Sequence, residues 1–289
     1  MKPAPFEYVA ARDANDAVAS LARFGDEAKV LAGGQSLVPM LALRLARPAA
    51  LVDINGCRDL EGLEESGGTL IVGALARQRD LERWARTRSP LLRDVLASVA
   101  HAPIRNRGTA VGNLVHADPA SELPALLLCL DGSVAARNPR GERVVRADQL
   151  YLAPLTTSLA PAELATSARF TLPPEGAGWG FAEVARRHGD FALVGCVAIL
   201  ALDDAGSTAH ARLGFFGVGA TPVRSAAGEA VLVGREPTAA RRMEAAKAAA
   251  AALSPDSDLH ASAEYRRKVA AVLAERVLAA AVGRCQGPR

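Results

Sequence analysis

The sequence lacks the long apolar runs of a membrane protein. No stretch of its 289 residues approaches the ~20 unbroken apolar residues that a membrane helix needs, so we expect no membrane insertion. Residues 1–16 also lack the apolar core of a secretory signal, and Glu7 and Asp13 add negative charge that is untypical of transit peptides. We therefore expect a cytoplasmic protein.

Closely spaced cysteines are also missing. Iron–sulfur and zinc sites usually take at least two ligands from one short turn, and no two cysteines here are close enough for that. We expect no metal site, and we expect any iron–sulfur cluster to lie on another chain. The net charge is only +3 and the basic residues are scattered, so nothing favours nucleic acid as a partner. The cysteines are Cys57, Cys129, Cys196 and Cys285.

Hydrophobic residues make up 50% of the chain, enough for a sizeable core. In the first third, short apolar runs alternate with helical periodicity, which predicts mixed α and β structure. The strands expected there are 29–32, 51–54 and 70–72. The helices expected there begin near residues 13–15 and 36, and two more cover 80–86 and 90–101.

Proline and glycine cluster at residues 172–178, which indicates a domain boundary. Beyond it, apolar runs predict three strands and then two Ala-rich helices. The last helix should pack through one face, made of Tyr265, Val269, Val272, Leu273 and Ala280. The strands expected are 180–186, 193–202 and 208–218, and the helices are 237–253 and 262–282.

The first motif is a strand followed by Gly33-Gly34 and then a helix start at Ser36. Adjacent glycines allow several backbone N–H groups to converge on an anion, and a helix N-terminus adds partial positive charge. Such a loop suits a diphosphate. A tight turn is the simpler explanation for a glycine pair taken alone.

The second motif, at residues 105–124, is densely polar between hydrophobic segments. Thr109 and Asn113 are neutral donors, whereas Asp118 and Glu122 are acceptors, a mixture that suits a phosphorylated polyol. The alternative is a long surface loop with ordinary turn chemistry. The third motif, at residues 181–192, puts Phe191 beside a basic–acidic turn that could cover a planar ring or could simply be a solvated hairpin.

Together these motifs resemble the FAD-binding (medium) subunit of molybdenum hydroxylases. That family includes the medium subunit of aerobic carbon monoxide dehydrogenase and the flavin domain of xanthine dehydrogenase. The resemblance covers nearly the whole chain. The segments that carry it are AGGQS at 32–36, RNRGTAVGNLVHADPASELPA at 105–125, LTTSLAPAEL at 155–164, ARRHGDFALVG at 185–195 and ASAEYRR at 261–267.

The resemblance implies an α+β fold. A PCMH-type FAD-binding domain of two α/β subdomains would span residues 1–175. A C-terminal domain with a three-stranded antiparallel sheet and helices would span residues 176–289. Val111 stands where the family commonly has glycine, and a positive φ there would strain valine.

The resemblance also implies which residues contact FAD. The first two motifs would hold the diphosphate, Glu122 would bond cofactor hydroxyls with help from Asp118, Leu164 would pack near the isoalloxazine, and Asp190 and Phe191 would shield it. The full set is Leu31, Ala32, Gly33, Gly34, Gln35, Ser36, Leu37, Thr109, Ala110, Val111, Gly112, Asn113, Asp118, Glu122, Leu164, Asp190 and Phe191.

The function implied is electron transfer, with no general base or nucleophile on this chain. Electrons would come from the 2Fe-2S clusters of a small partner subunit and leave for an external acceptor. A large subunit with the molybdenum cofactor would hydroxylate the substrate, and the assembly would be a dimer of heterotrimers. Two alternatives remain open, a stand-alone flavin oxidoreductase and an assembly subunit that has lost FAD.

Overall fold

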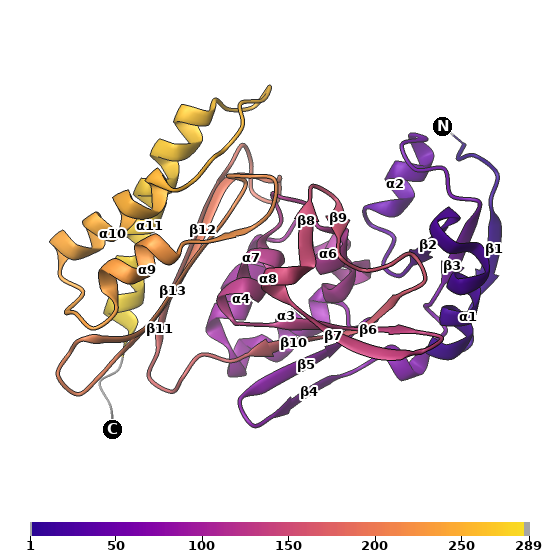
Figure 1. Ribbon diagram of the computed structural model, residues 1–289, viewed down its shortest axis with the longest axis horizontal. Helices are drawn as coiled ribbons and strands as arrows, with labels where there is room; N and C mark the ends of the chain where they lie inside the picture. The colour runs from indigo at the N-terminus through magenta and orange to yellow at the C-terminus, as the bar shows by residue number, and fades with distance from the viewer. Residues whose placement is uncertain (1, 286–289) are drawn as a thin grey trace.

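The structure is a computed structural model that describes residues 2–285. Figure 1 shows three units along the long axis: an N-terminal α/β unit, a central unit around the largest sheet, and a C-terminal sheet with helices on its outer face. Within the described range, every helix is too short or too polar to span a bilayer.

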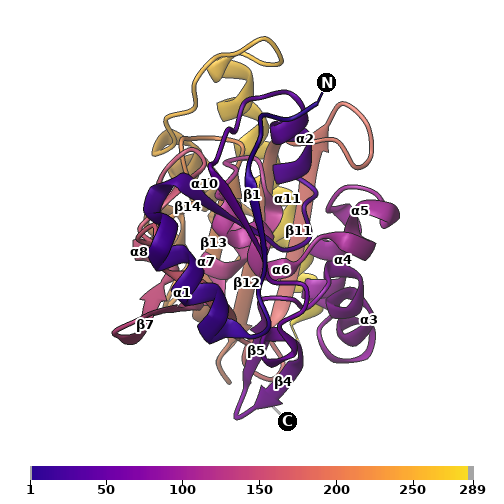
Figure 2. The same cartoon turned by 90° about the vertical axis from the view of Figure 1, so that its right-hand side faces the viewer.

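The N-terminal unit contains a parallel three-stranded sheet in the order β1-β3-β2. Asp13 caps the first helix by accepting from the Asp16 amide, as the sequence indicates. Figure 2, viewed from this end, shows α2 near one end of the sheet and α1 near the other. The elements are β1 (Glu7–Ala10), α1 (Ala14–Phe24), η1 (Gly25–Glu27), β2 (Ala28–Leu31), α2 (Leu37–Ala42), β3 (Ala50–Asp53) and η2 (Arg58–Leu60).

The central unit is a five-stranded antiparallel sheet in the order β4-β5-β10-β6-β7, packed with helices. Its strands are β4 (Leu63–Ser66), β5 (Thr69–Gly73), β6 (Ser133–Asn138), β7 (Gly141–Arg146) and β10 (Leu164–Thr171), with the small pair β8 (Tyr151–Ala153) and β9 (Thr156–Thr157). Its helices are α3 (Gln78–Arg88), α4 (Pro90–Ser98), α5 (Ala102–Arg107), α6 (Ala110–His116), α7 (Glu122–Cys129) and α8 (Ala147–Leu150).

The C-terminal unit has an antiparallel sheet in the order β11-β12-β13-β14. The three predicted strands are present, and β14 adds a fourth of two residues. The strands are β11 (Gly178–Ala185), β12 (Ala192–Leu202), β13 (Thr208–Phe216) and β14 (Val223–Arg224), and the helices are α9 (Ala226–Leu232), α10 (Ala239–Ala251) and α11 (Ala263–Arg284).

Strand β12 is buried on both faces because it lies between two hydrophobic cores. Val194, Cys196 and Ala198 belong to the core under α10 and α11. Val197 and Ile199 belong to the core of the central unit. Successive side chains of a strand point to opposite faces, so a continuous apolar run is needed at this position.

The predicted packing face of α11 is right at Leu273, which is buried, and at Val269, which packs against the core, but wrong at Tyr265 and Val272. Tyr265 and Val272 are 45% and 51% exposed, whereas Ala270, Ala274 and Ala281 are buried. The cause lies in β11, where a Cβ atom at Gly180 would come within 2.1 Å of the Val277 carbonyl oxygen. Close helix–sheet approach selects a face on which alanines alternate with Leu273, Val277 and Leu278.

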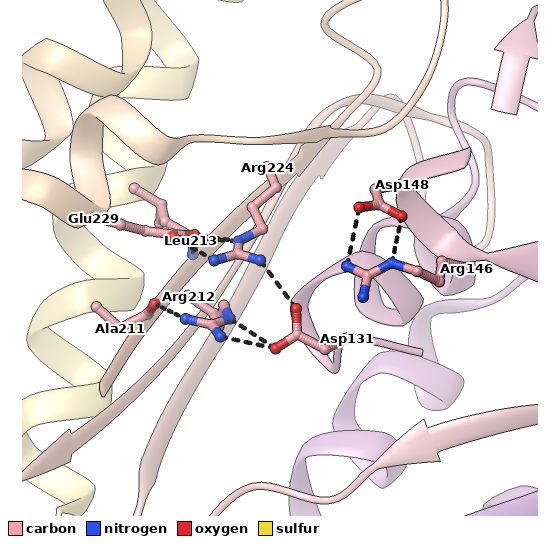
Figure 3. Close-up of polar contacts among 8 residues, drawn as sticks. All are labelled: Asp131, Arg146, Asp148, Ala211, Arg212, Leu213, Arg224 and Glu229. Atoms are coloured by element: carbon pink, nitrogen blue, oxygen red, sulfur yellow. Dashed lines mark hydrogen bonds and ion pairs between the residues drawn. The ribbon is translucent and has the colours of Figure 1, made fainter. Parts of the chain in front are cut away.

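Charged side chains join the central and C-terminal units (Figure 3). Asp131, in the turn after α7, accepts from Arg212 Nη2 at 2.8 Å and from Arg224 Nη1 at 3.0 Å. Arg224 also donates to Glu229 at 2.8 Å, and Glu229 accepts from the Leu213 amide. One carboxylate therefore holds two strands of the C-terminal sheet against the central unit.

Candidate functional site

The first two motifs, 75 residues apart in the chain, meet at one backbone contact. A Cβ atom on Gly33 would lie 2.5 Å from the Arg107 carbonyl oxygen and 2.7 Å from Gly108 Cα. Only glycine therefore allows the β2–α2 loop to lie against the start of the second motif. The sequence analysis singled out Gly33 and Gly34 as a candidate binding loop, and the structure shows why Gly33 has to be glycine.

A hollow of about 400 Å³ opens beside this contact. Gly34 has a φ of 72°, and the Gln35 side chain donates to the Gly33 carbonyl at 2.8 Å, which shapes the loop. The hollow is lined by Leu31, Ala32, Gly33, Gly34, Gln35, Val38, Pro39, Asp53, Asn55, Ile104 and Arg107. Of the predicted residues of this loop, Ser36 and Leu37 do not line the hollow.

Asn55 and Arg77 support this hollow and were missed from the sequence. Asn55 Nδ2 donates to the Ala32 carbonyl at 2.8 Å, and its Oδ1 accepts from Arg77 Nη2 at 2.7 Å. Arg77 Nη1 donates to the Arg107 carbonyl at 2.7 Å, so one guanidinium joins both motifs. The sequence did hold one signal for this part of the site. Asp53 and Asn55 lie at the carboxyl end of a strand, and ligands of parallel sheets commonly bind at that end.

Asp53 is held in its ionised form at the same strand end. Burial raises its pKa, but hydrogen bonds from Tyr8 and Asn55 outweigh burial, and the net pKa lies below the ordinary value. The Tyr8 hydroxyl donates to Asp53 at 2.5 Å. A fixed negative charge therefore lies in the wall of the hollow.

The second motif is helical, so its interpretation as a surface loop is wrong. Thr109 caps α6 by accepting from the Gly112 amide at 3.1 Å, and Asn113 accepts from the Ser121 hydroxyl at 2.8 Å. Val111 lies within α6, is 1% exposed and is not among the residues with positive φ. Valine is therefore unstrained there and belongs to the core.

The end of α6 leads to the two predicted carboxylates. Ala117 ends the helix with a φ of 55°, and Asp118 then accepts from the Ala120 amide at 2.9 Å. Glu122 begins α7 and is 7% exposed. Burial raises the pKa of Glu122 to about 8, and Glu183 and Asp118 nearby act in the same direction.

Glu183 is a half-buried carboxyl, contributed by β11, that the sequence did not single out. Its Oε2 atom has no hydrogen-bond partner, and burial raises its pKa to about 7. The charge of Glu183, on the C-terminal unit, also raises the pKa of Glu122 on the central unit. A buried carboxylate oxygen without a hydrogen-bond partner, as at Glu183, is suited to a ligand that brings hydroxyl groups.

The third motif meets the second one around a cavity of about 610 Å³. Asp118 and the turn containing Asp190 and Phe191 line it together, and Phe191 is 70% exposed. The same cavity is lined by Pro119, Ala120, Arg186, Gly189, Ala192, Leu193, Gly217, Gly219, Asp256, Asp258, His260 and Arg266. Leu164 is separate from it, fully buried in the central core.

The arrangement fits a long, polar cofactor. One hollow is bounded by backbone at a glycine pair, and the other is lined by Asp118 and the exposed ring of Phe191. Helix α6 connects them, since Thr109 at its start adjoins Gly33 and Asp118 beyond its end lines the larger cavity. Residues 2–285 contain no group of three or more His, Cys, Asp or Glu able to hold a metal ion.

Comparison with known proteins identifies the family. Residues 4–173 match the FAD binding domain in molybdopterin dehydrogenase, and residues 179–281 match the CO dehydrogenase flavoprotein C-terminal domain. The chain belongs to the FAD-binding subunits of the molybdenum hydroxylases. The predicted family, its α+β fold and the FAD cofactor are thereby confirmed, and the chain is an oxidoreductase subunit.

Individual relatives match over almost their whole length. The chain is 40% identical to the 6-hydroxypseudooxynicotine dehydrogenase complex subunit alpha of Paenarthrobacter nicotinovorans, covering 99% of this chain and 97% of that one. A chain of carbon monoxide dehydrogenase from Hydrogenophaga pseudoflava superposes with a TM-score of 0.95 at 36% identity, and the match covers 99% of this chain and 100% of that one. A chain of quinoline 2-oxidoreductase from Pseudomonas putida 86 superposes with a TM-score of 0.92 at 33% identity, and the match covers 98% of this chain and 99% of that one.

Proposed function

We propose that this chain relays electrons through FAD, from the 2Fe-2S clusters of a small partner subunit to an external acceptor. A large subunit with the molybdenum cofactor would oxidise the substrate, and the complex would be a cytoplasmic dimer of heterotrimers. Residues 1–175 would bind FAD, and residues 176–289 would form the C-terminal domain. Relatives of this chain are subunits or chains of dehydrogenase complexes, which supports the expected partners.

The observation that carries the proposal is that three motifs, separated in sequence, surround two hollows at opposite ends of one short helix. Backbone N–H groups at Gly33-Gly34 and at Thr109–Asn113 would bind the diphosphate. The cofactor supplies the redox chemistry, while the protein orients it and tunes its potential.

The carboxyls would bind the sugar part of the cofactor. Glu122, aided by Asp118, would accept hydrogen bonds from ribityl or ribose hydroxyls, which relieves the cost of burying that acceptor. Leu164 would support the isoalloxazine through the core, and Asp190 and Phe191 would cover it. In this proposal no side chain acts as general base or nucleophile.

The visible absorption spectrum of the purified chain, followed by acid release of any cofactor, tests the FAD assignment. Stoichiometric, acid-releasable FAD with negligible turnover of small donors is the expected result. Turnover of a small organic donor by the isolated chain would instead favour a stand-alone flavin oxidoreductase. A colourless protein that fails to take up FAD would favour an assembly subunit.

A further inference from the structure

The segment 261–267, one of those that carry the family resemblance, contains a buried arginine outside the proposed cofactor contacts. Arg266 is 7% exposed, although it begins the second turn of α11. Burying a guanidinium is costly unless its donors are satisfied, so its partners indicate what it does.

Those partners all lie on the large cavity. Arg266 Nη1 donates to the carbonyl oxygens of Leu193 and Gly217, the latter at 2.8 Å, and Nη2 donates to Asp258 at 2.6 Å. All four residues line the cavity that also contains Asp190 and Phe191. The planar fork of arginine suits such a set of acceptors, which a single ammonium group cannot match.

Leu193 is a special position in the sheet. In the register of β11 with β12, Val184 pairs with Val194 and Ala185 with Ala192, so Leu193 is the extra residue of a bulge. A bulge leaves a residue unpaired and redirects the strand, often beside an active site. Arg266 binds the carbonyl of this residue, two positions after Phe191.

The other two contacts extend this attachment. The Gly217 amide donates to the Pro119 carbonyl at 2.8 Å, so the carbonyl contact at Gly217 reaches the second motif. Asp258 accepts from the His260 and Ala261 amides, which fixes the α10–α11 loop. One side chain therefore joins α11, the bulge and the α10–α11 loop, which lines the same cavity as Phe191.

We propose that Arg266 is a positioning residue, which fixes the bulge in β12 and thereby holds the Asp190–Phe191 turn over the cofactor. This inference rests on the proposed function, since it gives the turn the task of covering the flavin. Arg266 touches neither cofactor nor substrate in this account and acts only through the turn.

The chain offers a cofactor-independent measurement, because trypsin cleaves after Arg186 and Arg187 in the same turn. In the cofactor-free full chain, Arg266→Gln should speed cleavage after Arg187 by about tenfold, the change expected when hydrogen bonds to a charged group are lost. Arg266→Lys keeps the charge but not the fork, so its rate should be intermediate. Mass spectrometry identifies the cut.

Arg267→Gln is the matched control, since exposed Arg267 makes one contact at 3.4 Å, to the Leu253 carbonyl. It should leave the cleavage rate unchanged. An unchanged rate in both Arg266 variants would overturn the proposal. Should Arg266→Gln not fold, the Lys variant decides by the same criterion.

A double-mutant cycle then tests the link to the cofactor. Arg266→Gln and Phe191→Ala should each weaken FAD binding by about tenfold, and the double variant should lose little more, because both act through one turn. Additive losses would contradict action through Phe191. If the wild-type chain does not bind FAD, the proposed function fails, while the cleavage rates still decide whether Arg266 holds the turn.

Discussion

The carbonyl oxygen of Arg107 lies 2.5 Å from the place that a Cβ atom would occupy on Gly33. This contact joins a loop of the N-terminal unit to the start of the second motif, and Arg77 reinforces it with a hydrogen bond to the same carbonyl. A methyl group there must push the two backbones apart.

Gly33→Ala should therefore destabilise the protein by about 1–3 kcal/mol, as for overpacking of a tight interior, and should abolish stoichiometric FAD binding. Gly283→Ala is the matched control, because nothing lies within 4 Å of a Cβ atom at that helical position. It should be neutral or stabilising by up to about 1 kcal/mol. Urea denaturation and the flavin content of each protein measure the two effects.

Val111→Gly tests whether valine in the second motif is a defect. Val111 is buried within α6, so glycine removes core packing and loosens the helix. We expect a loss of about 2–3 kcal/mol from the cavity and the helix propensity together. A higher melting temperature in the variant would contradict the helical, unstrained placement of Val111.

Glu122→Gln should change how stability depends on pH. The pKa of Glu122 rises from an ordinary 4.5 to about 8 on folding, so ionisation is disfavoured only in the folded state. The wild-type chain should therefore lose stability between pH 4.5 and about 8. The variant should lose less, because only the raised pKa of Glu183 still acts in this range. Relative to wild type, the variant should gain about 2–4 kcal/mol between pH 4 and pH 9 in the cofactor-free state.

Glu264→Gln provides the comparison for that experiment, since Glu264 is exposed and paired with Lys268 at 2.7 Å. Its difference from wild type should not grow with pH in this way. Equal pH profiles for Glu122→Gln and wild type would show that the Glu122 carboxyl is not held neutral by burial.

Asp131→Asn should weaken the attachment of the C-terminal unit (Figure 3). Asparagine tolerates the φ of 43° at this position, so the change removes charge without adding backbone strain. Because the carboxylate is partly exposed, solvent screening limits the expected loss to about 1 kcal/mol.

Asp148→Asn is the control drawn in the same figure, where Asp148 pairs with exposed Arg146 inside the central unit. It should cost less than about 0.5 kcal/mol. High salt should reduce the effect of Asp131→Asn. Equal losses in the two variants would argue against a special role for the contact between the units.

Much of the fold was predictable because strands and glycine turns leave local signals. Helix α1 begins near residues 13–15 as predicted, with Asp13 as its cap, and the apolar run of β12 correctly indicated a strand. The helices of the second motif had signals too, a proline in the first turn of α5 and Thr109 as the cap of α6. They were missed because the polar residues suggested a loop.

The features that the sequence did not predict depend on contacts between residues far apart in the chain. The packing face of α11 depends on glycines in β11, about 100 residues earlier, which admit alanines and leave Tyr265 exposed. Asn55 and Arg77 support the smaller hollow through backbone carbonyls, and no local pattern specifies such partners. Glu183 has the sequence context of an ordinary strand residue, and only the structure shows that its charge acts on Glu122.

The most direct test of the electron relay is to follow flavin absorbance in the assembled complex after rapid mixing with substrate. FAD should bleach only when the iron–sulfur and molybdenum subunits are both present. Transfer to an external acceptor should stop when this chain is omitted. Bleaching by substrate in the isolated chain, or undiminished acceptor reduction without this chain, would contradict the electron relay.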